Sequence, residues 1–180
     1  MKICVLFPGV GYHCDKPLLY YSGKLAAQDG YEVVKLNFSG FQKGIRGSSE
    51  KVGSAADAAL SMAEEQLAET DFSAYDEAVF IGKSIGTVAC LAYRQKYGIK
   101  AKCILLTPLE QTFQYDAADS TAFHGTSDPW ADTELIERLC RENDVPLHEY
   151  DRANHSLETG DTSCDLKNIL DVMEKLKKLI

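Results

Sequence analysis

The chain lacks the features that mark membrane, secreted and nucleic-acid-binding proteins. Its 180 residues contain no membrane-length apolar run, and the apolar stretch after Lys2 ends within five residues at Pro8 and Gly9, which is too short for a signal peptide. Lys and Arg number 19 against 27 Asp and Glu, which disfavours binding to nucleic acid or to an anionic membrane. We therefore expect a cytoplasmic protein whose partner is a small molecule, with no nucleic-acid or membrane partner; the oligomeric state stays open.

The six cysteines lack the spacing of metal and redox sites. No pair follows the C-x-x-C pattern, which zinc and thiol-redox centres commonly use. Cys4, Cys90 and Cys103 fall inside apolar stretches, so we expect small buried side chains rather than disulfides. We expect neither a metal nor a cofactor.

Short apolar stretches alternate with helical patterns along the whole chain. Strands are expected at 3–7, 32–36, 77–81, 103–106, 121–124 and 146–150, and helices at 17–28, 52–69, 85–97, 132–141 and 165–179. Near-continuous apolar strands separated by helices predict a parallel sheet covered on both faces. We expect one α/β domain over residues 1–180, folded as a three-layer α/β/α sandwich with about six parallel strands.

In such sheets, ligands bind at the carboxyl ends of the strands, where successive connections leave in opposite directions. If the first strand lies between the second and third, this crevice falls between residues 8–14 and Ser84. Two helix details are also expected: Asp15 caps the first helix, and the last helix buries one face. The residues expected on that face are Leu166, Ile169, Leu170, Met173 and Leu176.

The most informative stretch is Gly82-Lys83-Ser84-Ile85-Gly86, where a strand pattern meets a helical pattern. A strand that turns sharply into a helix needs small neighbours, because larger side chains would collide with adjoining backbone, and the turn lifts the serine Oγ above the sheet. The Ile85 amide would lie at the helix N-terminus, where it can face developing negative charge. We predict that Ser84 is a nucleophile and that Ile85 helps to form an oxyanion hole.

A serine nucleophile needs a base, and the base needs an orienting acid. Among four histidines, His155 lies in a polar loop after the last strand and is the predicted base. Asp128 follows the fifth strand and is the predicted acid, although an Asp before Pro often only begins a turn. Asp132 is more simply a helix cap, and Asp116 or Asp119 would require a different path of the loop.

Three motifs follow one another in the order serine, acid, histidine: Gly82-Lys83-Ser84-Ile85-Gly86, His124-Gly125-x-x-Asp128 and Asn154-His155-Ser156. Together they resemble the α/β-hydrolase superfamily, and most of all the small esterases without a cap that group near the dienelactone hydrolases. The likeness spans essentially the whole chain. It implies that Ser84 is the nucleophile, His155 the general base and acid, and Asp128 the orienting carboxylate.

The resemblance also implies a second oxyanion donor in the loop after the first strand. We expect the Val10 amide there, with Gly9 and Gly11 as alternatives. The chain differs from the family in beginning at what would be its third strand and in having only residues 108–120 where a cap is often inserted, so an open site and a minimal sheet are expected. Dienelactone hydrolases proper use cysteine at the elbow, so their substrate is not implied.

Several loop residues should rim the crevice as weak candidates for a substrate pocket: Gly9, Gly11, Tyr12, His13, Glu110, Gln111, Phe113 and Trp130. Lys83 beside the nucleophile is expected to point away from the pocket and to pair with a carboxylate, rather than to bind an anionic substrate. His124 is expected to be a buried hydrogen-bonding residue.

These features predict a serine hydrolase that cleaves a small carboxylic ester or thioester through an acyl-enzyme, with activity falling below about pH 6 as His155 gains a proton. The alternative is a non-catalytic ligand- or partner-binding protein with the same scaffold. A dinucleotide site beginning at Gly9 is disfavoured, since Cys14 replaces the third glycine and Asn37 the ribose-binding acid. Gly82-Lys83-Ser84 could also end a phosphate-binding loop, but that motif needs a glycine five positions before Gly82, where this chain has Glu77. We therefore do not expect a phosphate-binding loop.

Overall fold

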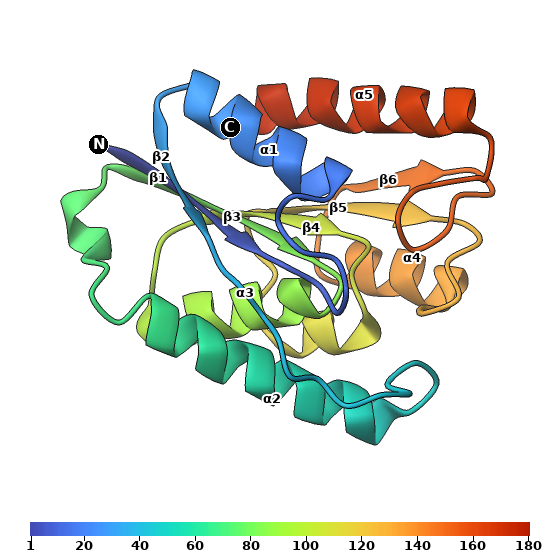
Figure 1. The fold of residues 1–180 in the computed structure, drawn as a ribbon, viewed down its shortest axis with the longest axis horizontal. Coiled ribbons are helices and arrows are strands. Elements are labelled where there is room, and N and C mark those ends of the chain that lie inside the picture. The colour runs from blue at the N-terminus through green and yellow to red at the C-terminus, as the bar shows by residue number, and fades with distance from the viewer.

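The computed structural model describes residues 1–180, and its six strands form one parallel sheet in the order β2-β1-β3-β4-β5-β6. The strands are β1 (Lys2–Phe7), β2 (Tyr31–Lys35), β3 (Glu77–Lys83), β4 (Lys102–Leu106), β5 (Ser120–Gly125) and β6 (Leu147–Tyr150). The helices are α1 (Pro17–Gln28), α2 (Ser49–Gln66), α3 (Ile85–Tyr97), α4 (Thr133–Glu142) and α5 (Thr162–Leu179), with short 3₁₀ turns η1 (Phe72–Ala74) and η2 (Glu110–Gln114). Helices α1 and α5 cover one face of the sheet, and α2, α3 and α4 cover the other (Figure 1). The predicted three-layer sandwich is confirmed.

No helix combines the length and the apolar character that crossing a bilayer requires.

Strand β1 lies between β2 and β3. This is the strand order for which the sequence predicted a crevice between residues 8–14 and Ser84. Phe7 at the end of β1 is paired with Gly82 near the end of β3, so the loops that follow both strands leave from the same edge of the sheet. They come very close, because a Cβ atom on Gly9 would lie only 3.1 Å from the Ser84 Cβ. The strand order therefore puts residues 8–14 directly against the serine turn.

Alternation along β3 assigns its side chains to the two faces of the sheet. Phe80 packs in the core beneath α2 and α3, whereas Val79 and Ile81 pack in the core beneath α1 and α5. Because strand side chains alternate with a period of two, Lys83 continues the row of Val79 and Ile81. Its side chain is thus directed to the layer of α1 and α5.

Three helices differ from the sequence expectation. Helix α5 begins three residues before residue 165, because the Asp161 side chain accepts a hydrogen bond from the Cys164 amide and caps the helix. Helix α2 begins three residues before residue 52 and ends three before residue 69, because the Ser48 side chain accepts a hydrogen bond from the Lys51 amide and caps the helix there. Asp15 does not cap α1: the N-cap position is Lys16, which makes no side-chain cap bond, and the Asp15 carboxylate pairs with Lys35 at 3.1 Å. Which polar side chain lies beside a helix N-terminus depends on the folded chain, so sequence spacing alone did not predict these caps.

Helix α5 also corrects an expectation about burial. Leu166 and Leu170 are 62% and 60% exposed rather than buried, whereas Met173 and Leu176 are buried. The fully buried residues of α5 lie in its C-terminal half, near the end of the chain that Figure 1 places beside α1. In the N-terminal half, Ile169 is half-buried and packs against the core on this side of the sheet, whereas the two leucines face solvent.

The glycines around the serine turn are required by close backbone contacts. A Cβ on Gly82 would lie 2.6 Å from the Gly86 carbonyl oxygen, and a Cβ on Gly86 would lie 2.1 Å from the Phe7 carbonyl oxygen. Distances this short are not tolerated by real side chains. Strand β1, strand β3 and helix α3 can therefore meet only where side chains are absent.

Gly86→Ala should destabilise the protein by roughly 3 kcal/mol, because the new methyl group forces β1 away from α3. Gly53→Ala on α2 is the matched control. Its Cβ would meet nothing within 4 Å, so the better helix propensity of alanine should leave stability unchanged or raise it by up to about 1 kcal/mol. Urea unfolding followed by circular dichroism measures both, and equal effects of the two substitutions would contradict this account of the elbow.

Candidate active site

Ser84 occupies a strained turn between β3 and α3. Its backbone has φ 57° and ψ −121°, in a region that non-glycine residues rarely adopt. Hydrogen bonds hold the strained residue on both sides: its amide donates to the Leu106 carbonyl at 3.0 Å, and its carbonyl accepts from the Thr87 amide at 2.8 Å and the Thr87 hydroxyl at 2.6 Å. The surrounding structure therefore fixes the direction of the Ser84 side chain.

The structure brings Ser84, His155 and Asp128 together from three parts of the chain. His155 Nε2 lies 2.7 Å from Ser84 Oγ, and His155 Nδ1 lies 2.7 Å from Asp128 Oδ2. An ionised carboxylate only accepts hydrogen bonds, so Nδ1 carries the proton and Nε2 is free to accept from the serine hydroxyl. This is the arrangement in which a histidine can act as a base toward a serine.

The other aspartates considered from the sequence have different partners. Asp132 caps α4 by accepting from the Leu135 amide at 2.9 Å, as its simpler interpretation predicted. The Asp116 carboxylate accepts from the Ala118 amide at 2.9 Å. Of the aspartates considered, only Asp128 pairs with His155, so Asp116, Asp119 and Asp132 are not its carboxylate partners.

The loops that carry the acid and the base are themselves held together. Asp128 is buried, and its Oδ1 accepts from the Trp130 amide at 2.8 Å. The His155 carbonyl accepts from the Thr107 hydroxyl at 3.1 Å, and the Trp130 ring stacks on the His155 ring with centroids 5.2 Å apart. Supporting contacts of this kind orient the reacting groups before any substrate arrives.

Burial sets the protonation of His155. The pKa of His155 is lowered to about 4, mainly because the imidazole is removed from water and in part because of the positive charge of Lys83, while Asp128 opposes both effects. The sign follows from the charged form being the protonated one, which a dry environment disfavours. His155 is therefore a neutral acceptor throughout the range from about pH 5 upward.

His124 lies beneath this pair, fully buried as expected. Its Nε2 is 3.0 Å from the Thr133 hydroxyl, and its Nδ1 is 4.0 Å from Asp128 Oδ2 without a hydrogen-bond partner. Burial lowers the pKa of His124, which Asp128 partly opposes. Asp128 is thus the one carboxylate that faces both histidines.

Two backbone amides are available for a developing oxyanion. Ile85 opens α3, so its amide has no intrahelical partner, and the Val10 amide makes no hydrogen bond within the chain. The Gly9 amide is already used, since it donates to the Tyr12 carbonyl at 3.0 Å, which removes Gly9 as an alternative donor. Gly11 remains open as an alternative, and the role of Val10 remains a prediction.

A chain of hydrogen bonds ties η2 to the serine turn. The Leu109 amide donates to the Thr112 hydroxyl at 3.2 Å, and the Thr112 and Thr87 hydroxyls are 2.6 Å apart. The Thr87 hydroxyl in turn donates to the Ser84 carbonyl. The segment after β4 therefore sits directly over the elbow, a placement that sequence patterns did not reveal.

A cavity of about 260 Å³ opens between this segment, the start of α2 and the loop after Asp128. Its lining comprises Gly47, Ser48, Ser49, Val52, Leu109, Glu110, Gln111, Trp130, Ala131 and Asp132. Among the predicted pocket residues, Glu110, Gln111 and Trp130 line this cavity, whereas Gly9, Gly11, Tyr12, His13 and Phe113 do not. Residues 47–52 were missed, because only the folded chain brings the start of α2 beside η2.

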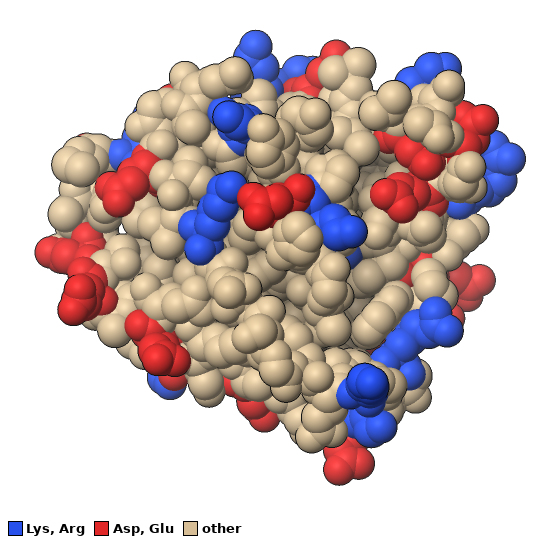
Figure 2. Space-filling model, viewed as in Figure 1, with Lys and Arg blue, Asp and Glu red and all other residues tan.

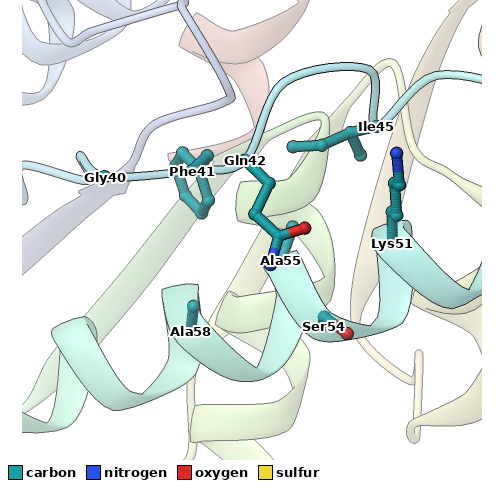
Figure 3. A pocket seen from close by; sticks show the side chains of 8 residues that line it. All are labelled: Gly40, Phe41, Gln42, Ile45, Lys51, Ser54, Ala55 and Ala58. Atoms are coloured by element: carbon teal, nitrogen blue, oxygen red, sulfur yellow. The ribbon is translucent and has the colours of Figure 1, made fainter.

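A second cavity, of about 130 Å³, lies between the loop at residues 40–45 and α2 (Figure 3). Figure 3 shows Phe41, Gln42 and Ile45 coming from the loop and Lys51 from the helix. None of the residues around Ser84 lines it. It is separate from the candidate active site.

Lys83 does not pair with a carboxylate, which corrects the expectation from the sequence. The residue is only 1% exposed, and its Nζ lies 4.9 Å from the centroid of the Tyr12 ring. Asp128, the buried carboxylate of the site, pairs with His155 and faces His124 instead. The side chain points into the layer of α1 and α5, away from the cavity beside Trp130.

No protein-family model and no curated relative matches the sequence. Solved structures do match along nearly the whole chain. A protein from Xanthomonas campestris assigned to the α/β superfamily of hydrolases is 14% identical, with 99% of both chains covered and a TM-score of 0.67. A serine hydrolase without a lid, also from X. campestris, is 13% identical over 99% of this chain and 80% of its own, with a TM-score of 0.62.

Est1E from Butyrivibrio proteoclasticus is 12% identical over 98% of this chain and 86% of its own, with a TM-score of 0.69. Identities this low establish the fold alone. The chain has the α/β-hydrolase fold in its minimal form without a cap, as the sequence motifs predicted.

The imidazole of His155 should titrate near pH 4, because burial and the nearby Lys83 charge oppose its protonation. Two-dimensional NMR of histidine ring signals between pH 3 and pH 8 measures this titration, and a His155→Gln variant identifies the signal by its loss. Titration near the ordinary histidine value of about 6.5 would contradict the buried geometry.

Proposed function

We propose that the protein is a serine hydrolase that cleaves a small carboxylic ester or thioester through an acyl-enzyme intermediate. The observation that carries this proposal is the continuous hydrogen-bond path from Ser84 Oγ through His155 to Asp128, with both links at 2.7 Å. The α/β-hydrolase fold supports it, because that fold presents a serine on a strand-to-helix turn. A pure binding protein has no physical need for a base held against a hydroxyl.

In the first half of the reaction, His155 Nε2 takes the Ser84 proton while Oγ attacks the substrate carbonyl carbon. The carbonyl oxygen becomes an oxyanion, which the amides of Ile85 and Val10 would face. Asp128 stabilises the imidazolium through the Nδ1 hydrogen bond. The proton then passes to the leaving oxygen or sulfur, and the acyl group stays on Ser84.

In the second half, water takes the place of the leaving group. His155 accepts a proton from the water as its oxygen attacks the acyl carbon, and the carboxylic acid departs as Ser84 Oγ regains the proton. The low pKa of His155, about 4, means that acid inactivation begins below the pH 6 expected from an ordinary histidine. At neutral pH, His155 is therefore in its neutral form and can accept the proton of Ser84.

The cavity beside Trp130 supports a small, uncharged substrate. Ser84, Asp128 and His155 do not line it, but it borders the site through Trp130, whose ring stacks on His155. Its volume of about 260 Å³ is at the small end for ligand sites, and two acidic residues, Glu110 and Asp132, line it. Negative charge there disfavours anionic substrates. In the view of Figure 2, Lys and Arg are scattered among Asp and Glu rather than gathered in one basic patch. We infer that neutral esters are preferred over thioesters with phosphorylated leaving groups.

Ser84→Ala should abolish labelling by a fluorophosphonate probe and lower ester turnover by about 10⁶-fold. Asp128→Asn should lower turnover by about 10⁴-fold, because the amide disturbs the histidine tautomer. Ser61→Ala, at an exposed serine on α2, is the matched control and should react like the wild type. Mass spectrometry locates the label, and a wild type that stays unlabelled at Ser84 would support the non-catalytic alternative instead.

Trp130→Phe should shift substrate preference toward longer acyl chains, since a smaller ring widens the cavity but still stacks on His155. Each methylene that becomes buried contributes about 0.8 kcal/mol, so kcat/KM for a p-nitrophenyl hexanoate should rise several-fold relative to the acetate. Tyr21→Phe, at an exposed aromatic residue on α1, is the control. An unchanged hexanoate-to-acetate ratio would show that the acyl group lies elsewhere.

A further inference from the structure

The two buried cationic residues of the chain, Lys83 and Arg94, are held very differently. Arg94 on α3 donates hydrogen bonds to the carbonyls of Ala101, Asp116 and Ala118. Lys83 is more deeply buried, yet its ammonium group makes neither a hydrogen bond nor an ion pair within the chain. A lysine side chain this deeply buried without a pairing carboxylate is costly, so its position directly before the nucleophile needs an explanation.

The contact that Lys83 does make is with Tyr12. Its Nζ faces the Tyr12 ring at 4.9 Å from the centroid, and cation–π contacts are strongest where water is excluded. Tyr12 closes the tight loop after β1 through two hydrogen bonds with Gly9, at 3.0 Å and 3.2 Å, and its hydroxyl accepts from the Leu18 amide at 3.1 Å. This loop carries the Val10 amide, so Lys83 links the nucleophile's strand to the oxyanion loop.

Charged and titratable groups from three loops surround Lys83. Asp128 comes from the loop after β5, His155 and Glu158 from the loop after β6, and Tyr12 from the loop after β1. Burial lowers the pKa of Lys83 to about 7, against the opposing pull of Asp128 and Glu158. His155 also faces His124, whose positive form would act on it in the same direction as Lys83.

We propose that Lys83 is a positioning residue of the proposed hydrolase: its contact with the Tyr12 ring holds the loop with the Val10 amide against the nucleophile's strand. This role rests on the proposed function. It gives a physical reason for a lysine without a pairing carboxylate at this position. The Lys83 ammonium faces the Tyr12 ring, and no carboxylate forms an ion pair with it.

Lys83 should therefore reduce stability while it supports catalysis. Its pKa is about 7 in the folded protein against the ordinary 10.5, so the unfolded chain holds the proton more tightly. The loss of folding stability caused by burying Lys83 is complete below about pH 7, and it is relieved as the pH rises toward 10.5. A methionine, similar in length and apolar, removes that loss of stability together with the charge.

The experiment compares Lys83→Met with wild type and with Lys102→Met, a control at an exposed lysine at the start of β4. We expect kcat to fall about tenfold with KM nearly unchanged, and the acid limb of kcat/KM to move up by about one pH unit. The melting temperature at pH 7 should rise, and this gain should shrink toward pH 10. The His155 NMR signal should titrate at higher pH in Lys83→Met, with no substrate involved.

Two substitutions of Tyr12 separate the contact from the charge. Tyr12→Leu removes the ring and should lower kcat without moving the acid limb, whereas Tyr12→Phe keeps the ring and should restore most of kcat. Lys83→Met combined with Tyr12→Leu should be no slower than the worse single variant, because both remove one contact.

The outcomes distinguish this role from the proposed function. A wild type labelled at Ser84, with a Lys83→Met variant whose kcat and acid limb are unchanged, would overturn the role of Lys83 alone. Parallel losses of melting temperature and kcat with an unmoved acid limb would show a merely structural lysine and would also overturn it. A wild type without labelling at Ser84 would overturn the proposed function and this role with it.

Discussion

The site depends on backbone segments that touch where side chains are absent. A Cβ on Gly86 would lie 2.1 Å from the Phe7 carbonyl, and a Cβ on Gly125 would lie 2.3 Å from the Ala153 carbonyl. The first contact brings the oxyanion loop to the serine turn, and the second brings the Asp128 loop to the His155 loop. Without both, three side chains far apart in the sequence could not form hydrogen bonds of 2.7 Å.

Electrostatics gives this geometry its chemical character. A single buried carboxylate, Asp128, faces the basic groups His155, His124 and Lys83. Burial lowers the pKa of each of the three, so the site resists gaining protons. A histidine kept neutral beside a serine hydroxyl is ready to act as a base, and the strained backbone of Ser84 keeps that hydroxyl in reach.

Most elements could be predicted from local patterns, because each depends on neighbours in the chain. Helix α3 begins and ends at the predicted residues 85 and 97, and the strands agree within two residues. The errors have specific causes: the Ser48 side chain caps α2 earlier than predicted, and Leu170 of α5 lies outside the buried face that holds Val172 and Leu176. Amphipathic spacing shows which residues could be buried, but not how far a covering layer extends.

The sequence by itself determined the order of strands and helices, the glycine-flanked serine turn and the identity of the acid and base candidates. These follow from hydrophobic periodicity and from residue types whose chemistry is local. Tertiary structure decided the rest: that Gly9 uses its amide on Tyr12, that residues 47–52 share a cavity with Trp130, and that Lys83 faces a ring instead of a carboxylate. Such contacts join segments distant in the chain, and only the packed layers bring them within reach of one another.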